Sequence, residues 1–326
     1  MNRLDTMDKT TRIRFSAEME NHDNLRAFAF FSANLHKLLP EVPFEDHASF
    51  FMEASRYWQL AGDDQRNLGW VDTCGTLGWP EGWRKPGIVA TFHTGPYRLP
   101  AMWLAKQGVP LTLVVSADVA RKQHDSYRTS YERIAGSPQA GGYEYLVAED
   151  PMILRKMVRA VQRGRFLLVY VDGHTGVGKN PHGRGTLTMD FLAHQLRVKT
   201  GVAELARLAR VPIYPVLARF DRQDQPVIER FEMLALDGTA HGAIGVGEGM
   251  AILYRHLATF VRQYPMQWEG WFHVHHDLVR PEGSVGGLFR HYLPFKLANR
   301  CFLLDKGSFR AYPLSEQVYR KLKKSV

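Results

Sequence analysis

From Gly87 onward, short apolar runs rich in β-branched residues alternate with segments that carry a helical pattern. Strands separated by helices pair through crossover connections, which place neighbouring strands parallel to each other. The alternation therefore predicts an α/β fold in which a central mixed, largely parallel sheet is flanked by helices. The strand-like runs are 88–92, 111–116, 166–171 and 213–220, and the helical segments between them are 99–107, 152–163 and 202–209.

The segments outside this pattern are expected to pack around the sheet. The N-terminal part is mainly helical, and a stripe of Leu25, Phe28, Phe31 and Leu35 at helical spacing indicates either core packing or a groove for a fatty chain. Residues 227–236 resemble an edge strand. A helix is expected over 251–264. We expect three consecutive parts, namely a helical region at 1–85 packed on the core, an α/β domain at 86–280 and a basic amphipathic C-terminal segment at 281–326.

The C-terminal segment mixes aromatic and basic residues and ends near Arg320-Lys321-Leu322-Lys323-Lys324. Such a tail is typical of a segment that lies on an anionic bilayer or docks a carrier protein. It is equally typical of a helix that covers the core and keeps its charged end in water. The alternatives stay open at the level of sequence.

Charge and cysteine content narrow the class of protein. The net charge of +9 over 326 residues favours an acidic partner. Cys74 and Cys301 lie far apart, which indicates neither a disulfide framework nor a cysteine zinc site and fits a reducing compartment. The N-terminus lacks a signal-peptide pattern, and no apolar run approaches the ~18 residues of a spanning helix. We expect a cytoplasmic protein with optional peripheral contact at the inner membrane.

A histidine follows the first strand-like run directly. His93 stands in the segment Thr91-Phe92-His93-Thr94-Gly95-Pro96, a glycine–proline turn between a strand and a helix. Turns of this kind expose catalytic groups in α/β enzymes, because the sheet holds the strand end rigid. A histidine there can accept a proton near neutral pH, so His93 is predicted to be a general base.

A glycine-rich segment follows the third strand-like run. It reads Asp172-Gly173-His174-Thr175-Gly176-Val177-Gly178-Lys179, with Arg184 close behind. Backbone N–H groups and cations in such a loop can converge on an oxyanion or a phosphate. The spacing matches neither a Walker loop nor a dinucleotide fingerprint. A hairpin and then a helix capped by Thr200 are expected next.

Taken in order, these motifs resemble the lysophospholipid acyltransferase superfamily and, within it, the lipid A lauroyl and myristoyl transferases. The resemblance covers roughly residues 85 to 280. The matching features are His93, Asp172-Gly173, Asp190-Phe191-Leu192 before Lys199-Thr200-Gly201, Leu205-Ala206-Arg207-Leu208 leading into Val211-Pro212-Ile213-Tyr214-Pro215-Val216, and Tyr264-Pro265-Met266-Gln267-Trp268 before His273.

The resemblance implies transfer of an acyl group from a thioester on acyl carrier protein or coenzyme A to a hydroxyl or amine. His93 would deprotonate the acceptor, with no covalent enzyme intermediate, no bound cofactor and no metal. The acceptor is either a lipid or a small biosynthetic intermediate. The residues expected to hold the substrate are Arg98, Gly173, His174, Lys179, Arg184, Thr200 and Gly201.

The sequence departs from the family pattern at one decisive position. The family has a carboxylate five residues after the histidine, where it orients the imidazole, and this chain has Arg98 there. An arginine cannot accept the ring N–H. Glu204, Asp172 and Asp118 are the candidate replacements. The apolar N-terminal anchor of lipid A acyltransferases is also missing from residues 1–40, which favours a soluble relative.

Rival functions are weaker on the same residues. His273 and His275 would share a face of a strand, but no third metal ligand has suitable spacing. No nucleic-acid-binding motif and no G-x-S-x-G elbow is present. A thioesterase and a non-catalytic acyl-carrier or lipid-binding homologue remain as alternatives, because both are compatible with the basic surface and with Arg98.

Overall fold

The computed structural model describes most of the chain, and the described part forms two compact units. The sheet unit comprises Tyr57–Leu187 and Val198–Trp268, and the terminal unit comprises Met1–Arg56, Thr188–Arg197 and Glu269–Val326. The described residues are 15–62 except 16, 69–136 except 75–77, 79, 82 and 84, and then 142–173, 185–236, 244–279 and 291–323. None of the helices in these ranges is long and apolar enough to cross a membrane.

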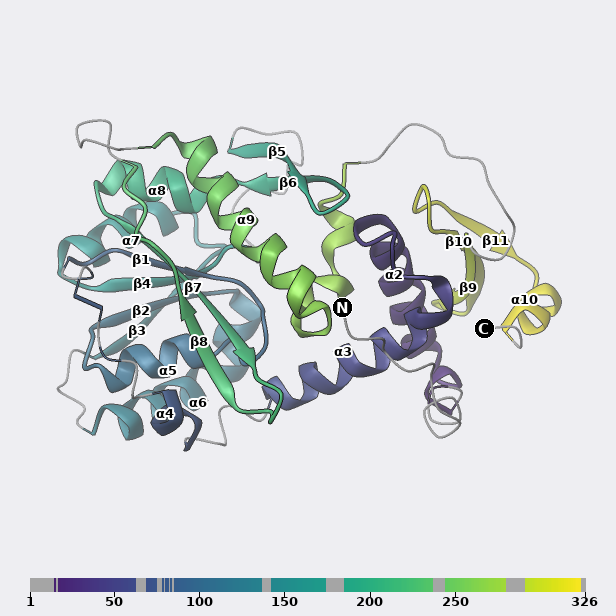
Figure 1. Cartoon of the computed structure of the whole chain (residues 1–326), viewed down its shortest axis with the longest axis horizontal. Helices are drawn as coiled ribbons and strands as arrows, with labels where there is room; N and C mark the ends of the chain where they lie inside the picture. Colours follow the sequence, from purple (N-terminus) through teal and green to yellow (C-terminus); the bar gives the residue numbers. More distant parts are fainter. Residues whose placement is uncertain are drawn as a thin grey trace. The chain divides into compact units, whose positions relative to one another are not determined.

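A six-stranded sheet forms the centre of the sheet unit (Figure 1). All its neighbouring strands run parallel except the last pair, in which β8 runs antiparallel to β7. The predicted fold class, a largely parallel sheet flanked by helices, is therefore confirmed. In spatial order the strands are β3 (Tyr143–Val147), β2 (Leu111–Val115), β4 (Phe166–Tyr170), β1 (Ile88–Thr91), β7 (Ile213–Phe220) and β8 (Pro226–Arg230).

Helices cover both faces of this sheet (Figure 1). On one face, α5 packs against α6 and α4, and on the other face α8 packs between α7 and α9. Helices α5, α6 and α7 each follow a strand of this sheet and return the chain to it, which is the arrangement that the alternating sequence pattern predicts. The helices are α4 (Gly69–Cys74), α5 (Leu99–Lys106), α6 (Ala117–Ala135), α7 (Ile153–Gln162), α8 (Gly201–Ala209) and α9 (Val246–Gln263).

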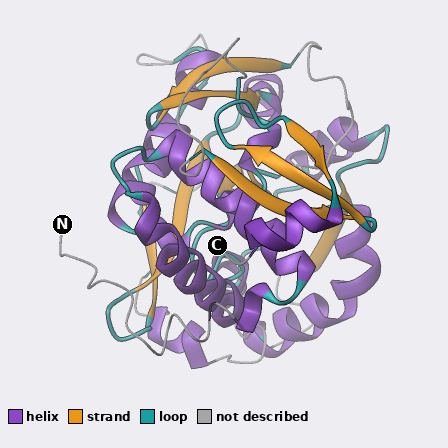
Figure 2. Cartoon of the chain, turned by 90° about the vertical axis from the view of Figure 1, so that its right-hand side faces the viewer, coloured by secondary structure: helices purple, strands orange, loops and turns teal. Residues whose placement is uncertain are grey.

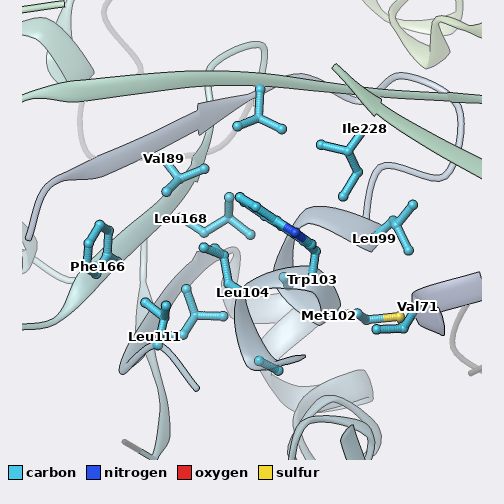
Figure 3. Packing of buried hydrophobic residues seen from close by; sticks show 14 of the residues in the cluster. Val71, Val89, Leu99, Met102, Trp103, Leu104, Leu111, Phe166, Leu168 and Ile228 are labelled. Carbon is cyan, nitrogen blue, oxygen red and sulfur yellow. The ribbon is translucent and has the colours of Figure 1, made fainter. Parts of the chain in front are cut away.

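The main hydrophobic core lies between the sheet and α5 (Figure 3). Trp103 of α5 is completely buried, and Val89 of β1 and Leu168 of β4 are buried in the same cluster. Each such apolar side chain contributes about 1.5–3 kcal/mol when it is removed from water. The core therefore fixes β1 and β4 side by side, and these are the two strands that lead to His93 and Asp172.

Two element boundaries differ from the sequence prediction. The last strand of the sheet ends at Arg230 instead of continuing to residue 236. Helix α9 begins at Val246 instead of residue 251, although its first turns contain glycines. A Cβ atom at Gly249 would lie 2.9 Å from Leu236 Cδ2. The close approach of the Leu236 side chain therefore favours glycine at this position in the helix.

The predicted hairpin is present, but Thr200 does not cap the helix as expected. Strands β5 (Thr186–Phe191) and β6 (His194–Lys199) form a two-stranded sheet. Thr200 occupies the N-cap position of α8 with φ −89° and ψ 0°, and its side chain makes no capping hydrogen bond. This backbone conformation is not the extended one in which a threonine hydroxyl reaches the first N–H groups of the helix.

The terminal unit contains residues from both ends of the chain. Helix α2 (His22–Leu38) packs on β9 (Tyr292–Leu297), so distant segments share one core. The stripe of Phe28 and Phe31 contacts Phe51 of α3 (His47–Gly62) at ring-centroid distances of 5.5 and 5.4 Å. These rings are buried, so the stripe is core packing and not a groove.

The C-terminal segment is mainly a small sheet and is helical only at its end. β9 pairs with β10 (Arg300–Asp305), and β10 pairs with β11 (Ala311–Leu314), all antiparallel. Helix α10 (Glu316–Lys323) follows and packs on β9 and β10. The three strands are drawn in orange in Figure 2. Of the alternatives for the tail, the structure shows a helix that covers a sheet.

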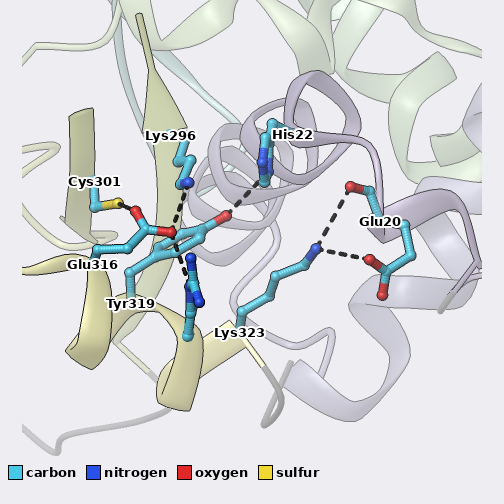
Figure 4. Close-up of polar contacts among 8 residues, drawn as sticks. Glu20, His22, Lys296, Cys301, Glu316, Tyr319 and Lys323 are labelled. Carbon is cyan, nitrogen blue, oxygen red and sulfur yellow. Dashed lines mark hydrogen bonds and ion pairs between the residues drawn. The ribbon is translucent and has the colours of Figure 1, made fainter. Parts of the chain in front are cut away.

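Ion pairs hold α10 in place (Figure 4). The Glu316 carboxylate accepts hydrogen bonds from Cys301 Sγ at 3.0 Å, Lys296 Nζ at 3.0 Å and Arg320 Nε at 3.1 Å. Together these bonds lower the pKa of Glu316 to about 2. Lys323 Nζ lies 3.2 Å from a carboxylate oxygen of Glu20. Several basic residues of the tail thus bind carboxylates within the terminal unit.

A buried lysine lies in the core of the terminal unit. Lys306 is fully buried, and its Nζ lies 4.2 Å from the centroid of the Phe44 ring and 3.4 Å from Ser32 Oγ. Ser32 Oγ in turn lies 2.7 Å from His47 Nδ1. Burial disfavours the ammonium form and lowers the pKa of Lys306 to about 8, although Glu45 opposes the shift.

We expect Lys306 to make the free energy of unfolding depend on pH in the alkaline range. Between pH 8 and about 10.4 the unfolded chain holds a proton that the folded chain has released, so the free energy of unfolding rises with pH, by up to about 1.4 kcal/mol per pH unit. Urea unfolding at pH 7.5 to 9.5 measures this rise. Lys306→Met should be more stable at pH 7.5 and should lack the rise. An identical pH dependence in the variant and the wild type would contradict the prediction.

Candidate active site

The topology of the sheet defines where a site can form. Strands β1 and β4 are parallel neighbours, and the chain leaves β1 towards α5 on one face and leaves β4 towards α8 on the other. Such a switch point opens a crevice at the carboxyl ends of the strands, where α/β proteins bind their ligands. Thr91 and Tyr170 are partners in the register. His93 and Asp172, each two residues further on, therefore emerge side by side.

His93 and Asp172 form a hydrogen-bonded pair at this point. His93 Nδ1 lies 2.8 Å from Asp172 Oδ1. The backbone N–H of His93 also donates to the same carboxylate, at 3.2 Å from each oxygen. The side chain of Asp172 is only 10% exposed, whereas that of His93 is 28% exposed. The carboxylate is thus largely buried, whereas the imidazole is partly exposed to solvent.

The environment of Asp172 keeps its carboxyl group ionised. Burial by itself would raise the pKa of Asp172, but the charge of His93 and hydrogen bonds from His93 and Trp268 outweigh burial and lower it. An ionised carboxylate only accepts hydrogen bonds, so Nδ1 of His93 must be the donor in the 2.8 Å contact. When the ring is neutral, the other ring nitrogen, Nε2, carries the lone pair that can accept a proton.

The segment Tyr264–Trp268 supports this pair from the other side. Trp268 Nε1 donates to Asp172 Oδ2 at 3.1 Å, and Trp268 also pairs with Thr94 through an isolated antiparallel β-bridge. The Gln267 amide is buried and makes two hydrogen bonds with the Phe220 backbone, at 2.7 and 2.9 Å. The sequence motif contains Trp268 and Gln267, but it predicted no role for either residue. Their position after Pro265 was the one available signal.

Two tyrosines surround the His93 ring. The Tyr170 ring stacks on it with centroids 4.6 Å apart and an interplanar angle of 24°. The Tyr97 ring contacts it edge-on at 5.0 Å. The Tyr170 hydroxyl donates to the Tyr97 carbonyl at 2.9 Å, which ties the two rings together. Sequence reasoning missed both residues, because an aromatic residue at a strand end has no pattern of its own.

Gly95 lets the turn after His93 pass close to β7. Its φ is +48°, and a Cβ there would lie 2.7 Å from Arg219 Cα and 2.9 Å from the Ala218 carbonyl oxygen. Its N–H donates to the Gln267 carbonyl at 2.7 Å. Only glycine combines this backbone conformation with such a close approach. The turn therefore fixes His93 relative to the neighbouring strand.

The Arg98 side chain binds residues of α3 and α6, so its role differs from that of the family's carboxylate at the same position. Its Nε donates to the Tyr127 hydroxyl at 3.0 Å, and its Nη1 donates to the Ala61 carbonyl at 2.9 Å. Its guanidinium also lies over the Tyr97 ring, 4.7 Å from the centroid. Arg98 thus joins the turn after β1 to α3 and α6.

The other two candidate carboxylates lie in ion pairs elsewhere. Glu204 on α8 pairs with Arg207 at 2.9 Å. Asp118 on α6 pairs with Arg121 and Lys122. Of the three carboxylates considered from sequence, Asp172 is the one within hydrogen-bonding distance of the His93 ring.

The glycine-rich loop is described only at its ends. Gly173 follows Asp172, and its carbonyl accepts a hydrogen bond from Lys199 Nζ at 3.4 Å. Gly185 accepts a hydrogen bond from the N–H of Thr200 at 2.9 Å, just before Gly201 begins α8. The predicted substrate-binding residues His174, Lys179 and Arg184 lie outside the described residues.

The histidine cluster at 273–276 does not have the predicted geometry. His273 and His275 do not share a strand face, because Val274–His276 forms a short 3₁₀ helix. The His275 ring stacks on Phe30 with centroids 4.6 Å apart. Across the described ranges, no group of three or more His, Cys, Asp or Glu side chains is arranged to hold a metal ion.

Comparison with known proteins identifies a family. The model of the bacterial lipid A biosynthesis acyltransferase family matches residues 44–276, well over half of the chain. No curated protein matches the chain significantly. The matched range contains both strands of the switch point, His93, Asp172 and the Tyr264–Trp268 segment.

The tight turn at Gly95 predicts a specific instability. Gly95→Ala adds a methyl group at 2.7 Å from Arg219 Cα, besides the strain of about 1–2 kcal/mol that alanine meets at positive φ. We expect a loss of about 3 kcal/mol or more in the free energy of unfolding. Gly108→Ala is the matched control, because Gly108 has φ +67° and nothing within 4 Å of its Cβ position. Equal losses in the two variants, measured by urea unfolding, would contradict the close approach.

Proposed function

The chain belongs to the bacterial lipid A biosynthesis acyltransferase family, and we propose that it moves an acyl group from a carrier-protein or coenzyme A thioester to a hydroxyl or amine, with His93 as the general base. The observation that carries this proposal is the 2.8 Å contact between His93 Nδ1 and a buried, ionised Asp172 at the switch point of the sheet. An imidazole oriented in this way has its second nitrogen ready to take a proton.

The proposed reaction is a direct displacement. Nε2 of His93 takes the proton of the acceptor, and the acceptor oxygen or nitrogen forms a bond to the thioester carbonyl carbon. The resulting tetrahedral oxyanion collapses and the C–S bond breaks. The sulfur takes the proton that His93 held and leaves as a thiol. Asp172 remains a carboxylate throughout and stabilises the imidazolium that forms in between. No covalent enzyme intermediate is required.

Asp172 takes the place of the carboxylate that the family pattern puts five residues after the histidine. In this chain that position is Arg98, whose Nε and Nη1 bind Tyr127 and Ala61. The carboxylate comes instead from the neighbouring strand, where the parallel register sets it level with His93. Trp268 holds its second oxygen, so the carboxylate cannot rotate away from the ring.

The substrate contacts follow the sequence motifs. We place the thioester carbonyl near the loop that begins at Gly173, where N–H groups and the cations Lys179 and Arg184 would stabilise the oxyanion or hold a phosphate. Family membership favours a lipid A precursor as the acceptor over a small biosynthetic intermediate. The enzyme would then act in the cytoplasm with peripheral contact at the inner membrane.

Substitutions in the pair test the proposal. Intact-mass spectrometry of acyl-carrier-protein and acyl-coenzyme A thioesters follows the loss of the acyl group in the presence of lipid A precursors. His93→Ala removes the base, and Asp172→Asn removes the charge that stabilises the imidazolium, so each should slow transfer by about 10²–10⁴-fold. Glu204→Gln is the matched control and should keep near-normal turnover, because Glu204 pairs with Arg207.

Three outcomes would contradict the proposal. Normal turnover in Asp172→Asn would remove Asp172 from the mechanism. Release of the acyl group without any acceptor would identify a thioesterase. Binding of the thioester without turnover, unchanged in His93→Ala, would identify a non-catalytic homologue.

A further inference from the structure

Helix α7 carries an unusually basic exposed face. Its sequence, Ile-Leu-Arg-Lys-Met-Val-Arg-Ala-Val-Gln, has no acidic residue. Arg155, Lys156 and Arg159 are all exposed, and Arg163 follows at the C-cap, also exposed. We call these four residues the α7 face. A helix that packs on the sheet needs only its apolar side, so the charge on the other side is not explained by folding.

A groove separates the α7 face from the edge strand β3. Side chains alternate along β3. The Tyr145 ring contacts the His124 ring of α6, with centroids 4.6 Å apart. Glu144 points to the opposite face, where its Oε1 lies 3.1 Å from Arg163 Nη2. The groove has a volume of about 480 Å³. Its lining residues are Glu144, Tyr145, Leu146, Lys156, Arg159, Gln162 and Arg163.

Two of these cations have no partner of their own. Arg163 binds Glu144, and Lys156 binds Asp150. The side chains of Arg155 and Arg159 make no hydrogen bond or ion pair with any residue that the structure describes. The α7 face thus carries two guanidinium groups without a side-chain partner among the described residues, and one of them, Arg159, lines the groove beside an edge strand that, within the described ranges, pairs only with β2.

We propose that the α7 face docks the acidic surface of an acyl carrier protein that delivers the thioester. This inference rests on the proposed function, because it names where the donor of that reaction binds. Charge complementarity supports it: the chain has a net charge of +9, and the α7 face presents four exposed cations on a helix that has no acidic residue. Met152 and Leu154, each 47% exposed, add an apolar border to the charged centre.

The start of the α7 face suits a carrier with a long flexible arm. β3 lies three strands away from β1 in the same parallel set, so both strands end at the same edge of the sheet. Three inter-strand steps of about 4.8 Å amount to roughly 14 Å. Helix α7 follows β3 and returns the chain to β4, so its first turns, with Arg155, begin at this edge, whereas Glu144 in the groove is level with Ile88 at the start of β1. A phosphopantetheine arm from a protein docked at the first turns of α7 can run along this edge to His93.

A carrier protein fits this surface better than a bilayer does. The surface is a hollow, and the carboxylate of Glu144 lines it. A membrane-binding surface presents a protruding apolar side with cations around it and buries little acidic charge. An acidic helix, by contrast, can bind Arg159 in the groove and Arg155 on the exposed side of α7.

The test compares donors that need the docking surface with donors that do not. Arg155→Glu/Arg159→Glu reverses the two unneutralised charges, and Arg255→Glu/Arg262→Glu on the exposed side of α9 is the matched control. With an acyl-carrier-protein thioester we expect KM to rise at least tenfold in the first variant, with kcat kept, and not in the control. With acyl-pantetheine both variants should match the wild type. Direct binding of the carrier protein, followed by biolayer interferometry, should weaken in parallel.

The outcomes separate this inference from the proposed function. Transfer with an unchanged KM for the carrier thioester in Arg155→Glu/Arg159→Glu overturns the docking surface and leaves the reaction intact. Carrier binding that depends on Arg155 and Arg159 without transfer from any donor supports the surface and overturns the reaction. Loss of binding to phosphatidylglycerol vesicles with normal carrier KM identifies the α7 face as a membrane surface and overturns the inference.

Discussion

The parallel pairing of β1 with β4 is the interaction on which the site depends. The ladder continues past the ends of both strands, where the N–H of Val171 donates to the Thr91 carbonyl at 2.8 Å. This bond sets His93 level with Asp172. Because side chains alternate along a strand, a slip of one residue would turn one of the two side chains to the opposite face. The buried core under α5, built around Trp103, resists such a slip because it fixes the buried face of both strands.

Much of the sheet could be predicted from sequence, because its central strands are buried on both faces and read as continuous apolar runs. The edge strand β3 was missed for the same physical reason. Tyr143-Glu144-Tyr145 alternates between two half-covered faces and lacks an apolar run. The C-terminal strands were missed because Tyr292, Phe295 and Phe302 also fit an amphipathic helix, and only pairing between β9 and β10 distinguishes the two.

The site could be predicted only in part. His93 stood out because a local pattern, strand then glycine–proline turn, marks a catalytic position. The choice among Glu204, Asp118 and Asp172 stayed open, because it depends on a register between segments 79 residues apart. Trp268 reaches the same carboxylate from 96 residues away. No window of sequence contains both partners of such contacts, so the partner of a histidine is a property of strand order and not of local composition.

The composition of the terminal unit has a consequence for how the protein is made. Asn34 Nδ2 donates to the Trp271 carbonyl at 2.6 Å, across 237 residues of chain. Helix α2 leaves the ribosome first, whereas β9, on which it packs, is among the last elements to be synthesised. The sheet unit can fold during this interval, since domains fold as units during translation. Phe31 therefore remains without Trp271 and Phe272, which contact its ring in the folded unit, until most of the chain has been translated, and the nascent chain depends on protection from aggregation for that time.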